Sequence, residues 1–351
     1  MDGKKMENGS WQPSPSAGRG RCAFARACTP AVAAGVLIIS GCDGPQSTLA
    51  TAGTGAERIA VLFWWMLAGG LLIWSVVMGI GLYAVRTRER RFTSRVSHIL
   101  IIGGGVIFPV VVLAVLLGYG LHLLAELRAP EAGSELHIAV SGEQWWWRVR
   151  YSGPDGEAVE LANEIRLPVG VSVELRLTSP DVIHSFWIPA LGGKMDMIPG
   201  RKTRLVLEPT RTGVFRGACA EYCGSSHALM AFPVVVMEAA AFDDWLEKQR
   251  RPAAPSGNRL AQRGENLFLM NGCGACHSVR GTDADGALGP DLTHLGSRLT
   301  IGAATLPNDI EALVRWITHP QAVKPEARMP GFGMLDEADL HAIATYLKGL
   351  Q

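Results

Sequence analysis

The sequence has almost no net charge, because 33 lysines and arginines are balanced by 32 aspartates and glutamates, for a formal charge of +1 at pH 7. A balance this even creates no overall field that would recruit nucleic acid or an anionic lipid surface. We therefore expect no nucleic-acid partner. The sequence also contains no internal repeat, so each segment has to be interpreted by itself.

Nothing in the sequence requires a disulfide, although the chain holds seven cysteines. Three of them lie in or beside an apolar N-terminal segment, and the other four form two close pairs. The N-terminal three are Cys22, Cys28 and Cys42, and the pairs are Cys219 with Cys223 and Cys273 with Cys276. Pairs this close in sequence indicate cofactor ligands, not crosslinks between distant parts of the chain.

Hydrophobic residues are abundant, at 48% of the chain, and two long runs of them predict membrane-spanning helices. Residues 59–85 carry no charge. As a helix they would extend about 40 Å, enough to cross a hydrocarbon core of about 30 Å. Residues 96–125 form the second run. The loop between them, residues 86–95, holds five arginines and one glutamate, so it should stay in the cytoplasm and leave both ends of the hairpin outside.

The N-terminal region resembles a bacterial lipoprotein signal. Arginines precede an apolar run that suits a signal peptide but is too short to span a bilayer. The run ends in Ile-Ser-Gly-Cys at Cys42, which resembles the lipobox whose cysteine is acylated and becomes the new N-terminus. We expect residues 1–41 to be removed and residues 42–58 to form an outer segment. The alternative is an unprocessed extension. The stretch before Arg19 is long for the first part of a signal peptide, and a start codon downstream of Met1 would explain that length.

The rest of the chain divides into a β-rich and a helical region. After Glu126, short runs alternate between apolar and polar residues, which predicts an antiparallel β-sandwich at residues 126–247. The strand candidates are residues 135–140, 145–151, 171–178, 203–207, 213–218 and 232–237. A polar, proline-containing stretch at residues 248–257 predicts a linker. Residues 258–351 look helical, and the clearest amphipathic segments there are residues 259–269 and 337–350.

A compact set of soft metal ligands lies in the β-rich region. Cys219 and Cys223 are followed by His227 and Met230, and His184 lies upstream. Thiolates, imidazoles and a thioether favour copper over harder ions. Two cysteines four positions apart on one loop can both bridge a pair of metals, whereas a mononuclear blue-copper site needs only one cysteine. The set therefore predicts a dinuclear copper centre with one imidazole for each metal.

The helical region carries the sequence Cys-Gly-Ala-Cys-His, which is the attachment pattern of c-type haem. Cys273 and Cys276 would bond the vinyl groups of the haem, and His277 would bind its iron. Alone, such a pattern can arise by chance or bind another metal. Here it lies in a helical segment that the two-helix topology places outside the membrane.

This helical segment resembles a class I cytochrome c over most of residues 258–351, because Gly-Pro-Asp-Leu and then Met-Pro follow the haem pattern. The resemblance implies that Pro290 orients His277 through its backbone carbonyl. It also implies that Met329 is the distal ligand of the iron, since a His/Met pair raises the iron potential. Met334 is the alternative distal ligand.

The copper ligand set resembles the CuA domain of cytochrome c oxidase subunit II, over roughly residues 57–240. The resemblance implies an all-β, cupredoxin-like sandwich that follows a two-helix transmembrane hairpin, with an all-α class I cytochrome c domain after it. It also implies a role for each ligand. The bridging ligands would be Cys219 and Cys223, the ligands of one copper His184 and Met230, and those of the other His227 and the backbone carbonyl of Glu221.

Two further roles follow from the same resemblance, together with one departure from the family. The side chain of Glu221 would bind a magnesium ion shared with subunit I, and Trp145 would be the residue through which electrons reach CuA. Many relatives carry a glutamate in the second helix that feeds a proton channel. Isoleucines and a leucine fill residues 99–102 here, and His98 is only a weak substitute.

These features favour subunit II of a respiratory cytochrome c oxidase. Electrons would come from cytochrome c or a cytochrome bc complex, pass through haem c and CuA, and continue to haem a and the oxygen-reducing centre in subunit I, coupled to proton translocation. Subunits I and III and membrane lipid are the expected partners. The expected location is the bacterial cytoplasmic membrane, with both cofactor domains on the periplasmic face.

Three other functions would each require a different set of features. A copper-delivery protein would bind one copper reversibly and need no haem. A quinol oxidase subunit would keep the helices and the sandwich but lack the copper ligands. A nitrogen-oxide reductase module can carry CuA, but the two N-terminal helices and Glu221 fit an oxidase better.

Overall fold

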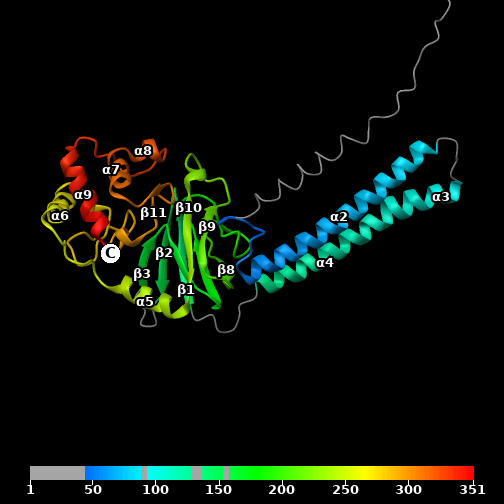
Figure 1. Ribbon diagram of the computed structural model, residues 1–351, viewed down its shortest axis with the longest axis horizontal. Coiled ribbons are helices and arrows are strands. Elements are labelled where there is room, and N and C mark those ends of the chain that lie inside the picture. Colours follow the sequence, from blue (N-terminus) through cyan, green and yellow to red (C-terminus); the bar gives the residue numbers. More distant parts are fainter. Residues whose placement is uncertain (1–43, 88–92, 129–135, 153–157) are drawn as a thin grey trace, which may run out of the picture. The chain divides into compact units, whose positions relative to one another are not determined.

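The computed structural model describes residues 44–87, 93–128, 136–152 and 158–351. The expected signal segment, residues 1–41, and Cys42 lie outside the described residues. Residues 44–351 form one unit that contains, in chain order, a pair of long helices, a β-sandwich and a helical domain (Figure 1). The three expected fold classes are therefore confirmed.

The two long helices lie side by side in Figure 1. The first, α2 (Thr54–Arg86), has 33 residues, and the 34 residues Ser94–Leu127 belong to a second continuous helix that ends at Arg128. The second comprises α3 (Ser94–His98), the π-helical η2 (Ile99–Ile107) and α4 (Phe108–Arg128). An ion pair of 3.1 Å between Arg58 and Glu126 joins the start of α2 to the end of α4. Both helices are long and apolar enough to cross a membrane, and the rest of the chain does not bury their most apolar stretches.

The sandwich consists of two five-stranded sheets, with strand orders β3-β2-β1-β5-β8 and β4-β10-β9-β6-β7. The first sheet contains β1 (Leu136–Glu143), β2 (Trp146–Ser152), β3 (Ala158–Ala162), β5 (Val173–Thr178) and β8 (Thr203–Leu207). The second contains β4 (Ile165–Pro168), β6 (His184–Trp187), β7 (Met195–Met197), β9 (Gly213–Cys219) and β10 (Ala231–Met237).

The expectation of a purely antiparallel sandwich is wrong at two places, where β1 pairs with β5 and β10 pairs with β4 in parallel. The chain leaves the first sheet after β3, crosses to the second at β4, and returns at β5. Parallel neighbours need a crossover connection of this kind, because a tight hairpin can join only antiparallel strands.

Three aromatic rings fill the centre of the sandwich. Trp147, Phe186 and Phe232 are fully buried, and their ring centroids lie 5.0–5.6 Å apart. Gly217 makes room for them, because a Cβ atom there would lie 2.1 Å from the ring of Phe232. Phe186 also pairs in register with Cys219, so this rigid packing supports the end of β9 at which the cysteine loop begins.

The helical domain follows α5 (Ala239–Arg250). Its helices are α6 (Arg259–Met270), α7 (Ile310–Thr318), α8 (Pro320–Val323) and α9 (Glu337–Gly349), and a short hairpin joins β11 (Thr300–Ile301) to β12 (Leu306–Pro307). The side chain of Asn258 caps α6 by accepting a hydrogen bond of 2.8 Å from the amide of Ala261. Helices α6 and α9 pack closely through Gly264, where a Cβ atom would lie 2.0 Å from the carbonyl of Ala342.

The stretch expected as a linker, residues 248–257, is partly helical and partly fixed to the helical domain. Helix α5 continues through Arg250, because the first helix-breaking proline comes only at Pro252. Beyond it, the amide of Ala253 donates to the carbonyl of Arg280 at 2.9 Å, and a ring nitrogen of His294 lies 3.0 Å from the carbonyl of Arg251. The tether is therefore short and anchored along part of its length.

Candidate copper and haem sites

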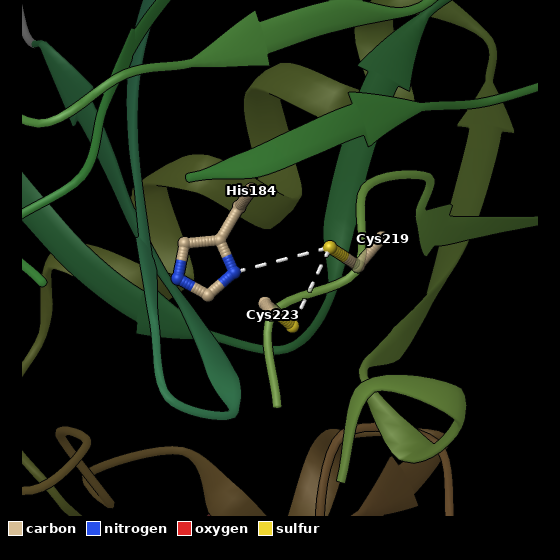
Figure 2. Close-up of side chains that lie close together, drawn as sticks. All are labelled: His184, Cys219 and Cys223. Carbon is tan, nitrogen blue, oxygen red and sulfur yellow. Dashed lines mark hydrogen bonds between the residues drawn. The ribbon is translucent and has the colours of Figure 1, made fainter. Parts of the chain in front are cut away.

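Two segments of the second sheet bring the predicted copper ligands together. Cys219 is the last residue of β9, Cys223 lies on the loop that follows, and His184 begins the neighbouring strand β6. Figure 2 shows the three side chains pointing toward one another. The sulfur of Cys219 lies 3.8 Å from Nδ1 of His184 and 3.8 Å from the sulfur of Cys223. These three ligand atoms are close enough to share a metal site.

The remaining predicted donors surround the same two sulfurs. Nδ1 of His227, in the short helix η3 (His227–Leu229), lies 3.5 Å from the sulfur of Cys223. The thioether of Met230 lies 3.9 Å from that sulfur, and the backbone carbonyl of Glu221 lies 3.2 Å from the sulfur of Cys219. All six donors thus meet in one place. Two central sulfurs with donors on both sides match the ligands that a pair of copper ions requires.

The site is buried and favours a thiolate. The side chains of His184, Cys219, Cys223 and Met230 are all buried. A hydrogen bond with Cys223 lowers the pKa of the Cys219 thiol to about 3, and the bond to His184 acts in the same direction. Burial would lower the pKa of His184, but its hydrogen bonds to Cys219 and Asp181 outweigh burial and raise it. The thiolate of Cys219 is therefore stabilised in this buried site, whereas the hydrogen bond with Cys219, together with burial, raises the pKa of Cys223.

Asp181 fixes the orientation of His184 and was not among the residues predicted from the sequence. Nε2 of His184 donates to Oδ1 of Asp181 at 2.9 Å, which turns Nδ1 toward the cysteines. The amide of Gln144 donates to Oδ2 of Asp181 at 2.7 Å and holds the carboxylate in place. Metal-binding histidines usually use their second nitrogen in this way. An acidic residue three positions before a ligand histidine was the signal available in the sequence.

Trp145, the residue expected to pass electrons to CuA, touches the cysteine loop directly. Its indole Nε1 donates to the carbonyl of Cys223 at 3.0 Å, and only 6% of the residue is exposed. Gly224 allows this contact, since a Cβ atom there would lie 3.0 Å from the indole ring. The geometry suits the expected role, which stays a prediction.

The side chain of Glu221, expected to bind magnesium, is about half exposed. It lies 3.8 Å from the ammonium of Lys194, which in turn lies 3.9 Å from Asp196. Both acids are therefore available at the surface on one side of the cysteine loop. The magnesium role itself stays a prediction.

The haem pattern lies in a turn between α6 and the next loop. Cys273 begins the short helix η4 (Cys273–Ala275), and the amide of His277 donates to the carbonyl of Cys273 at 3.0 Å. Nδ1 of His277 donates to the carbonyl of Pro290 at 2.8 Å, as expected, which leaves Nε2 to bind iron. Burial lowers the pKa of His277 and so favours the neutral imidazole that binds metal. Gly289 makes room for the ring, because a Cβ atom there would lie 2.6 Å from it.

The two candidate distal ligands lie in different environments. Met329 is partly buried and packs against the core of the helical domain, and its carbonyl accepts a hydrogen bond of 2.6 Å from the side-chain amide of Gln321. Met334 is 76% exposed. The placement therefore favours Met329 as the iron ligand. Two thiols, an oriented imidazole and a half-buried thioether on one domain fit a covalently bound haem.

Comparisons with known proteins agree with these two sites. Residues 154–239 match the family described as cytochrome C oxidase subunit II, periplasmic domain, and residues 261–351 match the cytochrome c family. The first match implies CuA and the second implies haem c.

Individual relatives carry the same description. The chain is 40% identical to cytochrome c oxidase subunit 2 of Alkalihalophilus pseudofirmus, over 63% of this chain and 64% of that protein. It is 33% identical to the protein of the same name from Bacillus subtilis, again over 63% of this chain and 64% of the relative. The chain thus spans slightly under two thirds of the length of these relatives.

A solved structure is similar to part of the chain. The periplasmic domain of subunit II of cytochrome oxidase of Bradyrhizobium japonicum is 34% identical, and the match covers 34% of this chain and 95% of that one, with a TM-score of 0.32.

Proposed function

Since the chain joins a periplasmic domain of the cytochrome c oxidase subunit II family to a cytochrome c domain, we propose that it is subunit II of a terminal respiratory oxidase, cytochrome-c oxidase. One observation carries the proposal. The sulfurs of Cys219 and Cys223, 3.8 Å apart, lie among two imidazoles and a thioether in a chain that also holds a complete haem attachment site. A copper-delivery protein needs neither the second imidazole nor the haem.

The residues of each site hold a cofactor rather than react themselves. When bound, the copper pair and the haem each supply a one-electron redox couple. Cys219 and Cys223 supply the charge that holds copper, and Asp181 fixes the imidazole of His184. Pro290 does the same for His277. Ligands held this rigidly change little between oxidation states, which favours fast electron transfer.

The proposed path runs from an external donor, cytochrome c or a cytochrome bc complex, through haem c and CuA to haem a and the oxygen-reducing centre of subunit I, coupled to proton translocation. Two features of this chain support contacts with partner subunits. The side chain of Glu221 is about half exposed beside the cysteine loop, available to bind a magnesium ion shared with subunit I. The exposed apolar faces of α2 and α4 offer a contact for subunits I and III in the bilayer.

We further propose a two-pass placement in the bacterial cytoplasmic membrane, with both cofactor domains on the periplasmic face. The arginines of the loop between the helices support this orientation. The family matched by residues 154–239 is itself described as periplasmic. Acylation of Cys42 would add a lipid anchor, although two spanning helices already hold the chain in the membrane.

Metal analysis and spectroscopy of the purified complex test the proposal. We expect two coppers and one haem c per chain of this subunit, and a mixed-valence copper signal in the near-infrared and electron-spin spectra. Cys219→Ser and Cys223→Ser should each abolish that signal, because an alcohol does not replace a thiolate that bridges soft copper. In Met230→Leu the copper should stay while its potential shifts. One reversibly bound copper, or an unchanged signal in either serine variant, would contradict the dinuclear assignment.

A further inference from the structure

Lys324, which directly follows α8, is a buried lysine with an unusual set of partners. Only 3% of the residue is exposed. Its ammonium donates to three backbone carbonyls, those of Trp145, of Leu229 at 3.0 Å and of Gly302 at 3.2 Å. Trp145 and Leu229 belong to the sandwich, and Gly302 belongs to the hairpin between β11 and β12 of the haem domain. A compact ammonium with three donors suits such a cup of carbonyl oxygens.

The carbonyls around Lys324 belong to segments that carry the cofactor ligands. Leu229 directly precedes the copper ligand Met230, and the indole of Trp145 donates to the carbonyl of Cys223. On the other side, Lys324 lies five residues before Met329, the distal ligand proposed for the haem iron. One side chain thus connects the copper loop to the loop that presents Met329.

Two hydrogen bonds between uncharged groups also join the sandwich to the haem domain beside Lys324. The hydroxyl of Ser226 donates to the carbonyl of Pro325 at 2.6 Å, and the amide of Ala231 donates to the carbonyl of Ala303 at 3.3 Å. Ala303 is 1% exposed and adopts a positive φ of 61°, which an alanine adopts only where its surroundings hold it. The hairpin tip is therefore shaped to fit against the start of β10.

A second, charged contact lies farther from the copper loop. The carboxylate of Glu164 accepts from the amide of Leu299 at 2.8 Å, and Arg166 extends toward the carbonyl of Ser297 at 3.4 Å. Arg148 donates to the carbonyl of Ala287 at 3.0 Å. The contact between the domains is thus made mainly of backbone groups paired with buried or partly buried side chains.

We propose that Lys324 is a positioning residue, which fixes the haem domain on the copper loop so that electrons pass between two loops held at constant separation. This inference rests on the proposed function. A buried ammonium bonded to carbonyl dipoles is screened far less by salt than a surface ion pair is. The docked arrangement should therefore persist at ionic strengths that release a soluble cytochrome.

Lys324→Met tests the proposal in the intact complex, because methionine keeps an unbranched side chain and removes the charge and its hydrogen bonds. Lys348→Met is the matched control, since the ammonium of Lys348 donates to the carbonyl of Gly296, at 3.0 Å, within the haem domain alone. Hydrogen exchange of the Ala231 amide reports docking directly. The Val234 amide, on the same strand and paired with Phe215 inside the sandwich, reports the stability of the sandwich itself.

We expect Lys324→Met to speed exchange at Ala231 by about tenfold or more, because a hydrogen bond to a charged group contributes on the order of a tenfold factor. Exchange at Val234 should stay unchanged. Flash-induced oxidation of haem c should become slower and sensitive to salt. The copper and haem spectra should remain those of the unmodified complex, and Lys348→Met should change none of these readouts.

The positioning role would be wrong if Lys324→Met kept intact spectra and matched the unmodified complex both in amide exchange at Ala231 and in the rate of haem c oxidation. Copper or haem missing from the unmodified protein would contradict the proposed function instead. If Lys324→Met fails to bind haem, Ser226→Ala removes the adjacent contact from the sandwich side. Faster exchange at Ala231 in Ser226→Ala would support the docked interface, and unchanged exchange would contradict it.

Discussion

Asp181 provides no ligand atom for copper, yet its carboxylate determines which nitrogen of His184 faces the cysteines. We expect Asp181→Ala to lower copper affinity by roughly 10–100-fold, the usual cost of removing a partner that orients a metal-binding histidine. Asp181→Asn should cost less, because the amide oxygen still accepts the hydrogen bond and only the charge is lost. Competition with a copper chelator measures both affinities. Equal affinity in Asp181→Ala and the unmodified protein would show that packing alone orients the ring.

Met329 and Met334 lie five positions apart, and the structure separates them by exposure. We expect Met329→Ala to abolish the weak sulfur-to-iron absorption of the oxidised haem domain and to lower its potential, because a thioether ligand raises it. Met334→Ala is the natural control and should leave both unchanged. The opposite pattern would assign the axial position to Met334.

At the residue scale, the sequence alone was sufficient to predict those ligands that lie together in a short motif. Cys219, Cys223, His227 and Met230 lie within twelve positions on one loop, so their proximity needs no knowledge of the fold. Lys324 is the opposite case. Its partner Trp145 lies 179 positions away, and no local pattern marks a lysine as buried. Contacts of this kind depend on the packing of whole domains.

At the scale of elements, the crossing of α6 and α9 depends on a glycine. Gly264→Ala would place a Cβ atom 2.0 Å from the carbonyl of Ala342, a backbone atom that cannot move without shifting α9. We expect a loss of about 1–3 kcal/mol in the stability of the haem domain, typical of overpacking. Thermal unfolding, followed by haem absorbance, should show a lower Tm. Gly349→Ala on α9 is the control, since nothing lies within 4 Å of its added Cβ. Equal Tm values for both variants would contradict this packing.

Several elements with a clear period were predicted closely. Strands β5 and β8 and helices α6 and α9 lie within a few residues of their expected bounds, because alternation or an amphipathic stripe marks each of them. Strands β3, β4, β6 and β7 were missed. The last two have only four and three residues, too few for a visible alternation, and the first three residues of β6 are all buried. The parallel pairing of β1 with β5 and of β10 with β4 also has no local signal in the sequence, because it arises from the crossover between the sheets.

At the scale of the whole molecule, two cofactor sites encoded far apart in sequence meet through a short tether and a specific contact. A flexible linker raises the effective concentration of one domain near the other, on the order of millimolar for short linkers. Here residues 251–253 are bonded to the haem domain, which shortens the free part of the tether. The carbonyl cup around Lys324 then selects one docked arrangement from those that the tether allows.

This combination predicts how electron transfer from the haem domain to the copper site responds to salt. A diffusing cytochrome c is steered by charge, so its rate falls as salt screens interactions beyond about 10 Å at 0.1 M. In this chain the partner is already present and no encounter step is needed. We therefore expect flash-induced oxidation of haem c in the uncut protein to be fast and nearly independent of ionic strength.

Cleavage of the tether separates the contribution of linkage from that of the contact. Ala254 and Pro255 are both exposed, so a protease site inserted between them is accessible without disturbing either domain. Cleavage should convert the transfer into a slower step that depends on concentration, because the severed haem domain no longer has its high local concentration. The same insertion left uncut is the control for the insertion itself. A steep salt dependence before cleavage would mean that the tethered domain detaches between turnovers, since only an encounter between separated charged surfaces is screened in this way.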